Sequence, residues 1–135
     1  MQITEQTESK AADPTTADLA PLFRAHAEMC KALANEHRLA IMYTLSHQGE
    51  RCVGDLAEDV GISVHLVSQH LRMLKERGLV QSRKEAQTVY YSITNEKLIQ
   101  ACTLIREALL EQHEARGVSL TAAELPAAMR REGSE

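Results

Sequence analysis

The chain has 135 residues and a formal net charge of −4, and 44% of its residues are hydrophobic although only 3% are aromatic. This length fits a single domain whose core must be aliphatic, and no apolar run reaches the roughly 18 residues that a membrane-spanning helix needs. The acidic total argues against a uniformly basic nucleic-acid binder, but residues 1–21 hold four carboxylates and one lysine, whereas residues 63–93 hold five Lys or Arg and two Glu.

A polar arm and two helices are predicted at the start of the chain. Residues 1–15 are polar and lack the apolar core of a secretory signal, so they are interpreted as a flexible arm. From about Thr16 onward, apolar side chains recur every three or four residues, which predicts an amphipathic helix with Pro21 in its first turns. Asn35 is a typical N-cap for a second helix over residues 36–47. The apolar face of the first helix is Leu19, Leu22, Phe23, His26, Cys30 and Leu33, and the inward positions expected in the second are Leu39, Met42 and Tyr43.

Residues 53–78 have the pattern of a helix-turn-helix. A short helical pattern ends at Gly61, and Ser63 is placed to cap a second helix that Gly78 stops. In this second helix, residues 64–77, one face is apolar and the other is rich in hydrogen-bond donors and short in carboxylates. Such a polar face suits phosphates and base edges, which predicts a recognition helix. The apolar stripe is Val64, Val67, Leu71 and Leu74, and the polar face is His65, Ser68, Gln69, Arg72 and Glu76.

A basic hairpin is predicted directly after the recognition helix. Residues 88–93 alternate like a half-buried strand, and the basic QSRK segment before them is expected to pair with them across a turn at residues 85–87. A basic hairpin in this place is a wing, whose tip reaches the DNA backbone or the minor groove. Residues 51–53, before the helix-turn-helix, fit no more than a short edge strand.

A long last helix is predicted over residues 96–116, with Thr94-Asn95 as its cap and Gly117 as its end. Its apolar residues offer more surface than one small domain needs, so we expect this helix to be shared across a dimer. The predicted fold is a mainly α, dimeric winged helix-turn-helix with the order α-α-(β)-α-α-β-β-α and a small β-hairpin wing. Its expected parts are an arm over residues 1–15, a domain over residues 16–116 and a tail over residues 117–135. The stripe of the last helix is Leu98, Cys102, Ile105 and Leu109.

Four segments of the chain resemble the ArsR/SmtB family of bacterial winged-helix repressors. They are ALANEHRLAIMYTL, ERCVGDLAEDVGIS, VSQHLRMLKERGLV and RKEAQTVYYSI. The resemblance extends over about residues 22–110. It implies a homodimer, joined through its first and last helices, that binds an inverted-repeat DNA operator and leaves it when an effector binds.

The resemblance also implies which residues meet DNA. Ser68 and Gln69 align with positions that usually face bases, and Gln can form two hydrogen bonds with adenine. Arg72, Arg83 and Lys84 suit phosphates, and an ordinary solvated charge is the alternative for Arg72. The full set of predicted DNA-binding residues is Ser63, His65, Ser68, Gln69, Arg72, Arg83 and Lys84. Outside this set, Arg38 is interpreted as an ion-paired brace of the domain and His70 as a structural residue.

Three sensor sites known in the family are incomplete in this sequence. The zinc type needs about four ligands on the last helix, and the corresponding residues supply a single carboxylate, so that site is absent. The arsenic or lead type has two thiols in a Cys-Val-Cys-Asp-Leu run, of which this chain keeps only Cys52. The sulfide type pairs two cysteines where this chain has Tyr43 and Leu110. The residues at the zinc-type positions are Asn95, Lys97, Ala108 and Glu111.

Cys30, Cys52 and Cys102, with His26, are the residues left as candidates for sensing. The chain has no C-x-x-C pair, and free cysteines are often small buried hydrophobes, so a structural role is one reading of all three. The other reading is a thiol switch or a soft metal or metalloid site, since His26 and Cys30 share a helix face and Cys102 is expected on a neighbouring helix. The sequence does not identify the effector.

The predicted function is that of a cytoplasmic DNA-binding repressor, acting as a homodimer without a membrane segment. The alternative is a winged-helix module for protein contacts that senses no effector, which the acidic net charge favours. An enzyme is not expected, because no nucleophile-and-base arrangement, phosphate-binding glycine loop or complete metal-ligand spacing is present.

Overall fold

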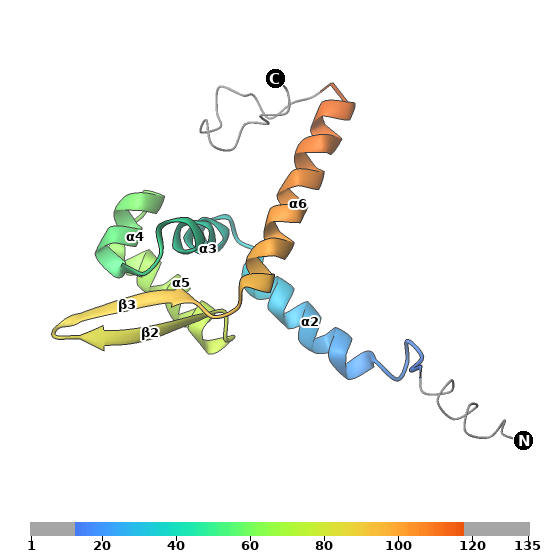
Figure 1. Cartoon of the computed structure of the whole chain (residues 1–135), viewed down its shortest axis with the longest axis horizontal. Helices are drawn as coiled ribbons and strands as arrows, with labels where there is room; N and C mark the ends of the chain where they lie inside the picture. Colours follow the sequence, from blue (N-terminus) through green and yellow to red (C-terminus); the bar gives the residue numbers. More distant parts are fainter. Residues whose placement is uncertain (1–12, 118–135) are drawn as a thin grey trace, which may run out of the picture. The chain divides into compact units, whose positions relative to one another are not determined.

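The computed structural model describes residues 13–117, with the helices and strands labelled as in Figure 1. It confirms the predicted order of helices and strands. The chain divides into two compact units, one ending at Thr94 and the other beginning at Asn95. The predicted tail after Gly117, and all but three residues of the predicted arm, lie outside the described residues. The elements are α2 (Ala20–Leu33), α3 (Glu36–Gln48), β1 (Arg51–Cys52), α4 (Val53–Val60), α5 (Val64–Glu76), β2 (Val80–Glu85), β3 (Thr88–Ile93) and α6 (Glu96–Ala115).

The helices α3, α5 and α6 begin at the caps that the sequence predicts. The Asn35 side chain accepts hydrogen bonds from two backbone N–H groups at the start of α3. Ser63 accepts one from the Leu66 N–H (3.1 Å), and Asn95 accepts one from the Lys97 N–H (2.8 Å). Thr94, expected to share the cap of α6, instead donates its hydroxyl to the Gly78 carbonyl (2.7 Å). Each cap satisfies a backbone donor that the first helical turn leaves without a partner.

The first helix begins later than expected. Thr15 and Asp18 form reciprocal side-chain-to-backbone hydrogen bonds of 3.0 and 3.1 Å, which start a turn at Thr16. The α-helix α2 itself begins only at Ala20, with Pro21 in its first turn as predicted. Pro lacks a backbone N–H, and that position needs none.

The core of the first unit lies between α3, α4, α5 and the start of β2. The structure corrects two expected core positions, because Leu39 and Val64 are 36% and 53% exposed. In α3 the inward face is rotated to Ile41, while in α5 Val64 is the first helical residue and precedes the part of the helix that packs. The almost fully buried side chains are Ile41, Met42, Leu45, Leu56, Val67, Leu71, Leu74, Leu79 and Val80.

A three-stranded antiparallel sheet with the order β1-β3-β2 forms the wing and its attachment. The strand β1 lies at an edge, as predicted, with Cys52 opposite Tyr90 of β3. Glu85 pairs with Thr88, so the turn is shorter than expected and consists of residues 86–87, with Ala86 at a left-handed φ of 57°. All six residues of the central strand β3 are half-buried. The alternating sequence therefore does not produce one buried and one exposed side. Figure 1 shows the β2–β3 hairpin beside α5, with which β2 is in contact.

The helices α2 and α6 carry large apolar side chains that the chain leaves exposed. On α2 these are Leu22 and Phe23, and on α6 they are Leu104, Ile105 and Leu109. Two of them, Leu22 and Phe23, belong to the predicted apolar face of the first helix, and Ala32 is the buried residue of α2. None of the described helices combines the length and apolar character that a bilayer span requires.

Candidate nucleic-acid interface

The orientation of α5 follows from its three buried residues. Val67, Leu71 and Leu74 have no exposed surface, so this side of the helix is fixed against the core. At 3.6 residues per turn, the side chains of His65, Gln69 and Arg72 must then point away from it, and all are exposed. Ser68 flanks this face and is exposed as well. Because the first carboxylate of α5 is Glu76 at its end, the exposed face is free of negative charge over most of its length.

Hydrogen-bond donors on this face are only partly engaged within the chain. The Gln69 and His65 side chains lie one turn apart, with their Nε2 atoms separated by 3.3 Å. Within residues 13–117, the side chains of Ser68 and Arg72 have no hydrogen bond or ion pair, so their polar atoms are available to a partner. Ser63 is an exposed residue, but its hydroxyl oxygen is engaged as the N-cap of α5. The α4–α5 turn that presents the face contains Gly61 in the left-handed conformation (φ 83°).

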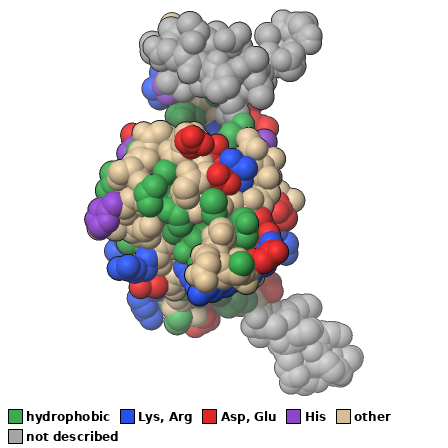
Figure 2. Space-filling view, turned by 90° about the vertical axis from the view of Figure 1, so that its left-hand side faces the viewer, with side chains coloured by type: hydrophobic (Ala, Val, Ile, Leu, Met, Phe, Trp, Pro, Cys, Tyr) green, Lys and Arg blue, Asp and Glu red, His purple; other side chains and the backbone are tan. Residues whose placement is uncertain are grey.

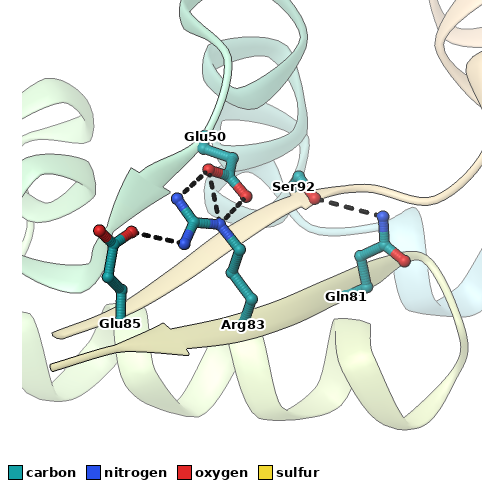
Figure 3. A network of polar contacts seen from close by, with 5 residues as sticks. All are labelled: Glu50, Gln81, Arg83, Glu85 and Ser92. Atoms are coloured by element: carbon teal, nitrogen blue, oxygen red, sulfur yellow. Dashed lines mark hydrogen bonds and ion pairs between the residues drawn. The ribbon is translucent and has the colours of Figure 1, made fainter. Parts of the chain in front are cut away.

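The two wing residues predicted to contact phosphates, Arg83 and Lys84, differ in their pairing. Arg83 is bound by two carboxylates, those of Glu50 and Glu85, at distances of 2.7 to 3.0 Å (Figure 3). Hydrogen bonding to these carboxylates raises the pKa of Arg83 and lowers the pKa of Glu50. Lys84 is exposed and, in the part of the chain that the structure describes, has no ion-pair or hydrogen-bond partner.

The positive charge predicted for residues 63–93 is therefore smaller than the sequence indicates. Besides Arg83, Arg77 at the end of α5 is paired, since its Nη1 lies 2.8 Å from a Glu28 carboxylate oxygen on α2. Lys75 donates to the Ser82 hydroxyl (2.8 Å) but remains a cation without a carboxylate partner among the described residues. On the face shown in Figure 2, Lys and Arg side chains lie beside Asp and Glu rather than in one continuous basic patch. Sequence reasoning missed Glu50 and Glu28 as partners, because they lie 33 and 49 residues from Arg83 and Arg77.

The inner edge of α5 is braced by Arg38 of α3. Its guanidinium donates to the carbonyls of Ala32 and Lys31 at the end of α2 and lies 3.4 Å from Nδ1 of His70. The expected brace is therefore present, but it uses carbonyls and a histidine instead of the expected ion pair. Burial lowers the pKa of His70, with smaller contributions from Arg38 and His37, whose ring lies 5.9 Å away. Within the described chain, His70 contacts these neighbours, in line with its structural interpretation.

The candidate sensing residues are free thiols in different environments. Cys30 is exposed, Cys52 is half-buried and Cys102 is buried. His26 precedes Cys30 by one turn of α2 and is exposed too. Among residues 13–117, no three His, Cys, Asp or Glu side chains come together in a way that would hold a metal ion. Cys30 and Cys102 belong to the two separately described units, so their pairing stays a prediction.

Comparison with known proteins supports the same reading of the chain. The profile described as "Bacterial regulatory protein, arsR family" matches residues 35–82. The cadmium resistance transcriptional regulatory protein CadC homolog of Staphylococcus aureus is 40% identical over 92 residues, which is 68% of this chain and 74% of that relative. The arsenical resistance operon repressor of Escherichia coli is 38% identical over 81 residues, 60% of this chain and 69% of that protein.

Solved structures extend the likeness to most of the domain. The solution structure of a homodimeric winged helix-turn-helix DNA-binding domain from Mycobacterium bovis is 35% identical with a TM-score of 0.65, covering 77% of this chain and 94% of that one. NolR from Sinorhizobium fredii is 33% identical with a TM-score of 0.63, covering 71% and 95%. With this agreement in sequence and fold, the chain belongs to the arsR family of bacterial regulatory proteins and has its winged helix-turn-helix fold.

Proposed function

We propose that this protein is a transcriptional repressor that binds an inverted-repeat DNA operator as a homodimer and is released by an effector. The observation that carries the proposal is the exposed face of α5. It presents hydrogen-bond donors without a carboxylate over three turns, while three fully buried residues fix its orientation. A rigid helix with such a face fits the major groove. The relatives named above are regulators, and one is named a repressor.

In this proposal, the residues of α5 and of the wing divide the contacts with DNA between them. Ser68 and Gln69 read base edges, and the Gln69 amide can bond adenine N6 and N7 at once. Arg72 and Lys84 bind phosphates, for which their unpaired charges are suited. His65 lies beside Gln69, one turn earlier, and contacts a base or a phosphate near the start of the helix.

The dimer is proposed to form through α2 and α6. Both helices expose large apolar side chains, of which Ile105 is 67% exposed, and such surface favours association. The Mycobacterium bovis domain, 35% identical, is homodimeric. A two-fold dimer presents two copies of α5 to half-sites about 34 Å apart, which matches an inverted repeat. In this account an effector acts by changing that separation.

Truncating the side chains proposed to contact bases, those of Ser68 and Gln69, tests this proposal. Gln69→Ala and Ser68→Ala should each weaken binding to a duplex that the wild-type protein has selected from a randomised pool. The expected loss for Gln69→Ala is about 1–3 kcal/mol per half-site, because a bidentate base contact disappears. The dimer should persist in sedimentation, since neither residue contributes to the core.

Gln48→Ala is the matched control for this experiment. Gln48 is an exposed glutamine at the end of α3, so its truncation removes the same amide group away from α5. It should bind the selected duplex as the wild type does. Full affinity in both Gln69→Ala and Ser68→Ala would show that α5 does not read the operator.

The effector is proposed to act on thiols, with Cys30 as the first site. Cys30 is the exposed cysteine, and His26 lies one turn away on the same helix, α2, which is also a proposed dimer helix. A thiolate and an imidazole suit soft metal ions, and a second copy would supply the remaining ligands. The Staphylococcus aureus relative is named for cadmium resistance.

Operator binding should therefore fall when reduced wild-type protein is exposed to As(III), Zn²⁺ or polysulfide. Cys30→Ser should abolish the response and leave unliganded affinity unchanged, with Cys52→Ser and Cys102→Ser as comparisons. If all three variants respond as the wild type does, the effector acts on another group.

A second candidate function is a winged-helix module that binds a protein. The pairing of Arg77 and Arg83 with carboxylates and the net charge of −4 favour it. The salt dependence of DNA binding, which ends the Discussion, separates the two functions.

A further inference from the structure

We propose that Arg83 positions the wing instead of binding DNA, and that Lys84 is the residue through which the wing contacts a phosphate. The inference deepens the proposed function and depends on it. It separates two neighbouring cations that look equivalent in the sequence. The basis is the set of contacts that Arg83 makes across the sheet.

Every nitrogen of the Arg83 guanidinium faces a carboxylate. Its Nε lies 2.9 and 3.0 Å from the two oxygens of Glu50, and its Nη2 lies 2.9 Å from Oε1 of Glu50. Its Nη1 lies 2.7 Å from Oε1 of Glu85 (Figure 3). Its Cζ is 4.9 Å from the centre of the Tyr90 ring, a cation–π contact. Planar, several-fold binding of this kind is specific to arginine.

These contacts tie the three strands together. Arg83 stands on β2 directly opposite Tyr90 of the central strand β3, and its guanidinium reaches beyond Tyr90 to Glu50. Glu50 immediately precedes β1, at the far edge of the sheet. The side chain thus links both outer strands across the middle one and fixes the angle at which the hairpin leaves the domain.

The link continues into the helix-turn-helix. Arg51, the first residue of β1, donates to the Asp59 carboxylate of α4 at 3.0 and 2.8 Å. The hairpin is therefore joined through Glu50 and the adjacent Arg51 to the helix that precedes α5. A change in this chain of ion pairs alters where the wing lies relative to the recognition helix.

The negative charge of Glu50 and Glu85 around Arg83 argues against a phosphate partner for this arginine. One guanidinium stands between two carboxylates, so the cluster carries a net negative charge. A phosphate that displaced Glu50 would lie close to the carboxylates of both Glu50 and Glu85, which are partly exposed. Lys84 is the next residue of β2 and its side chain points to the other face of the strand, without a carboxylate partner in the described chain. Lys84 is thus the cation that the wing can offer to DNA.

The salt dependence of DNA binding distinguishes the two roles. Each phosphate contact contributes about −0.9 to the slope of log K against log salt concentration. With the selected duplex at about 50 to 200 mM salt, Lys84→Gln should make the slope shallower by about one for each subunit. Arg83→Gln should weaken binding about three- to tenfold. The slope should not change, because a displaced wing fits the DNA less well but no phosphate contact is removed.

Two further variants sharpen the test. Arg83→Lys keeps the charge but not the planar donors, so it should behave like Arg83→Gln, whereas a phosphate contact would tolerate Lys. Glu50→Gln removes a negative charge and yet should weaken DNA binding, because the wing loses its anchor. Glu58→Gln, at an exposed position of α4 without a partner in the described chain, removes the same charge and should not weaken binding.

Amide hydrogen exchange in the free protein supplies a readout without DNA. Exchange in residues 80–93 should accelerate in Arg83→Lys and Glu50→Gln but not in Lys84→Gln. Wild-type affinity in Arg83→Lys, a shallower slope in Arg83→Gln, or unchanged exchange in Glu50→Gln would each overturn the assignment. Absence of DNA binding by the wild type would instead contradict the proposed function, and exchange alone would then decide whether Arg83 anchors the wing.

Discussion

At the scale of single residues, one arginine connects three helices of the domain. Arg38 of α3 donates to the Ala32 and Lys31 carbonyls, which lie at the end of α2, and its remaining nitrogen faces His70 of α5. Carbonyls at a helix end lack partners within the helix, so a fixed cation there replaces lost hydrogen bonds. Through His70, the same side chain joins a proposed dimer helix to the recognition helix.

The stability of the protein should depend on pH through His70. Burial, Arg38 and His37 lower the pKa of His70 below its ordinary value of 6.5, so the folded state favours the neutral ring. As the pH falls below 6.5, the unfolded chain takes up the proton first, and stability is lost until the pH has passed the folded pKa. Above 6.5 this contribution is fully present. The free energy of unfolding from urea titrations at about pH 5 to 8 should show this decline.

The variant His70→Gln tests whether the loss of stability at low pH comes from His70. It should be less stable than the wild type at neutral pH and should lose less stability on acidification. The carboxylates of Glu28 and Glu50, whose pKa values are lowered by their arginine partners, contribute in a separate window below their ordinary value of 4.5. An unchanged decline in His70→Gln would contradict the role given to this ring.

The sequence did not predict which groups pair with the charged side chains. Arg38 was expected to brace the domain, but its acceptors depend on where α2 ends and how α3 turns back. Arg83 was expected on DNA because it lies in a basic segment, and its main partner, Glu50, is 33 residues away. Such pairs are decided by tertiary packing, which no local pattern encodes.

At the scale of elements, local signals predicted where helices and strands begin. Asn35, Ser63 and Asn95 are caps whose side chains bond the first turn, and that chemistry depends on a few neighbouring residues. The direction in which a helix faces was predictable where its apolar residues form one stripe, as in most of α5. In α3, apolar residues occupy nearly every side, so the pattern could not choose Ile41 over Leu39.

In the wing, too, the strands could be predicted from nearby residues, whereas the turn and the angle of the hairpin could not. Alternating residues predicted the second strand and, by pairing, the first, yet the turn is shorter by one residue and places Ala86 in the left-handed region. That conformation favours glycine, and the sequence has none there. The angle of the hairpin is proposed to depend on Glu50, beside the other edge of the sheet. Strand pairing alone does not fix it.

At the scale of the whole molecule, the family and fold follow from the chain, while the proposed effector response does not. The exposed apolar residues of α2 and α6 are the basis of the proposed dimer interface. A sensing site that joined Cys30 to Cys102 would require the two units, or two copies, to come together. For this reason the sequence does not identify the effector, and thiol chemistry at the cysteines stays a proposal.

The most direct test of the claim that α5 and the wing bind DNA is the salt dependence of equilibrium binding by the reduced wild-type dimer to its selected duplex. Release of counterions makes log K fall linearly with log salt concentration. With Arg72 and Lys84 on phosphates in both subunits, the slope should be about −3.6 or steeper. Binding that does not change with salt, or no measurable binding, would contradict the account and favour a protein-binding module.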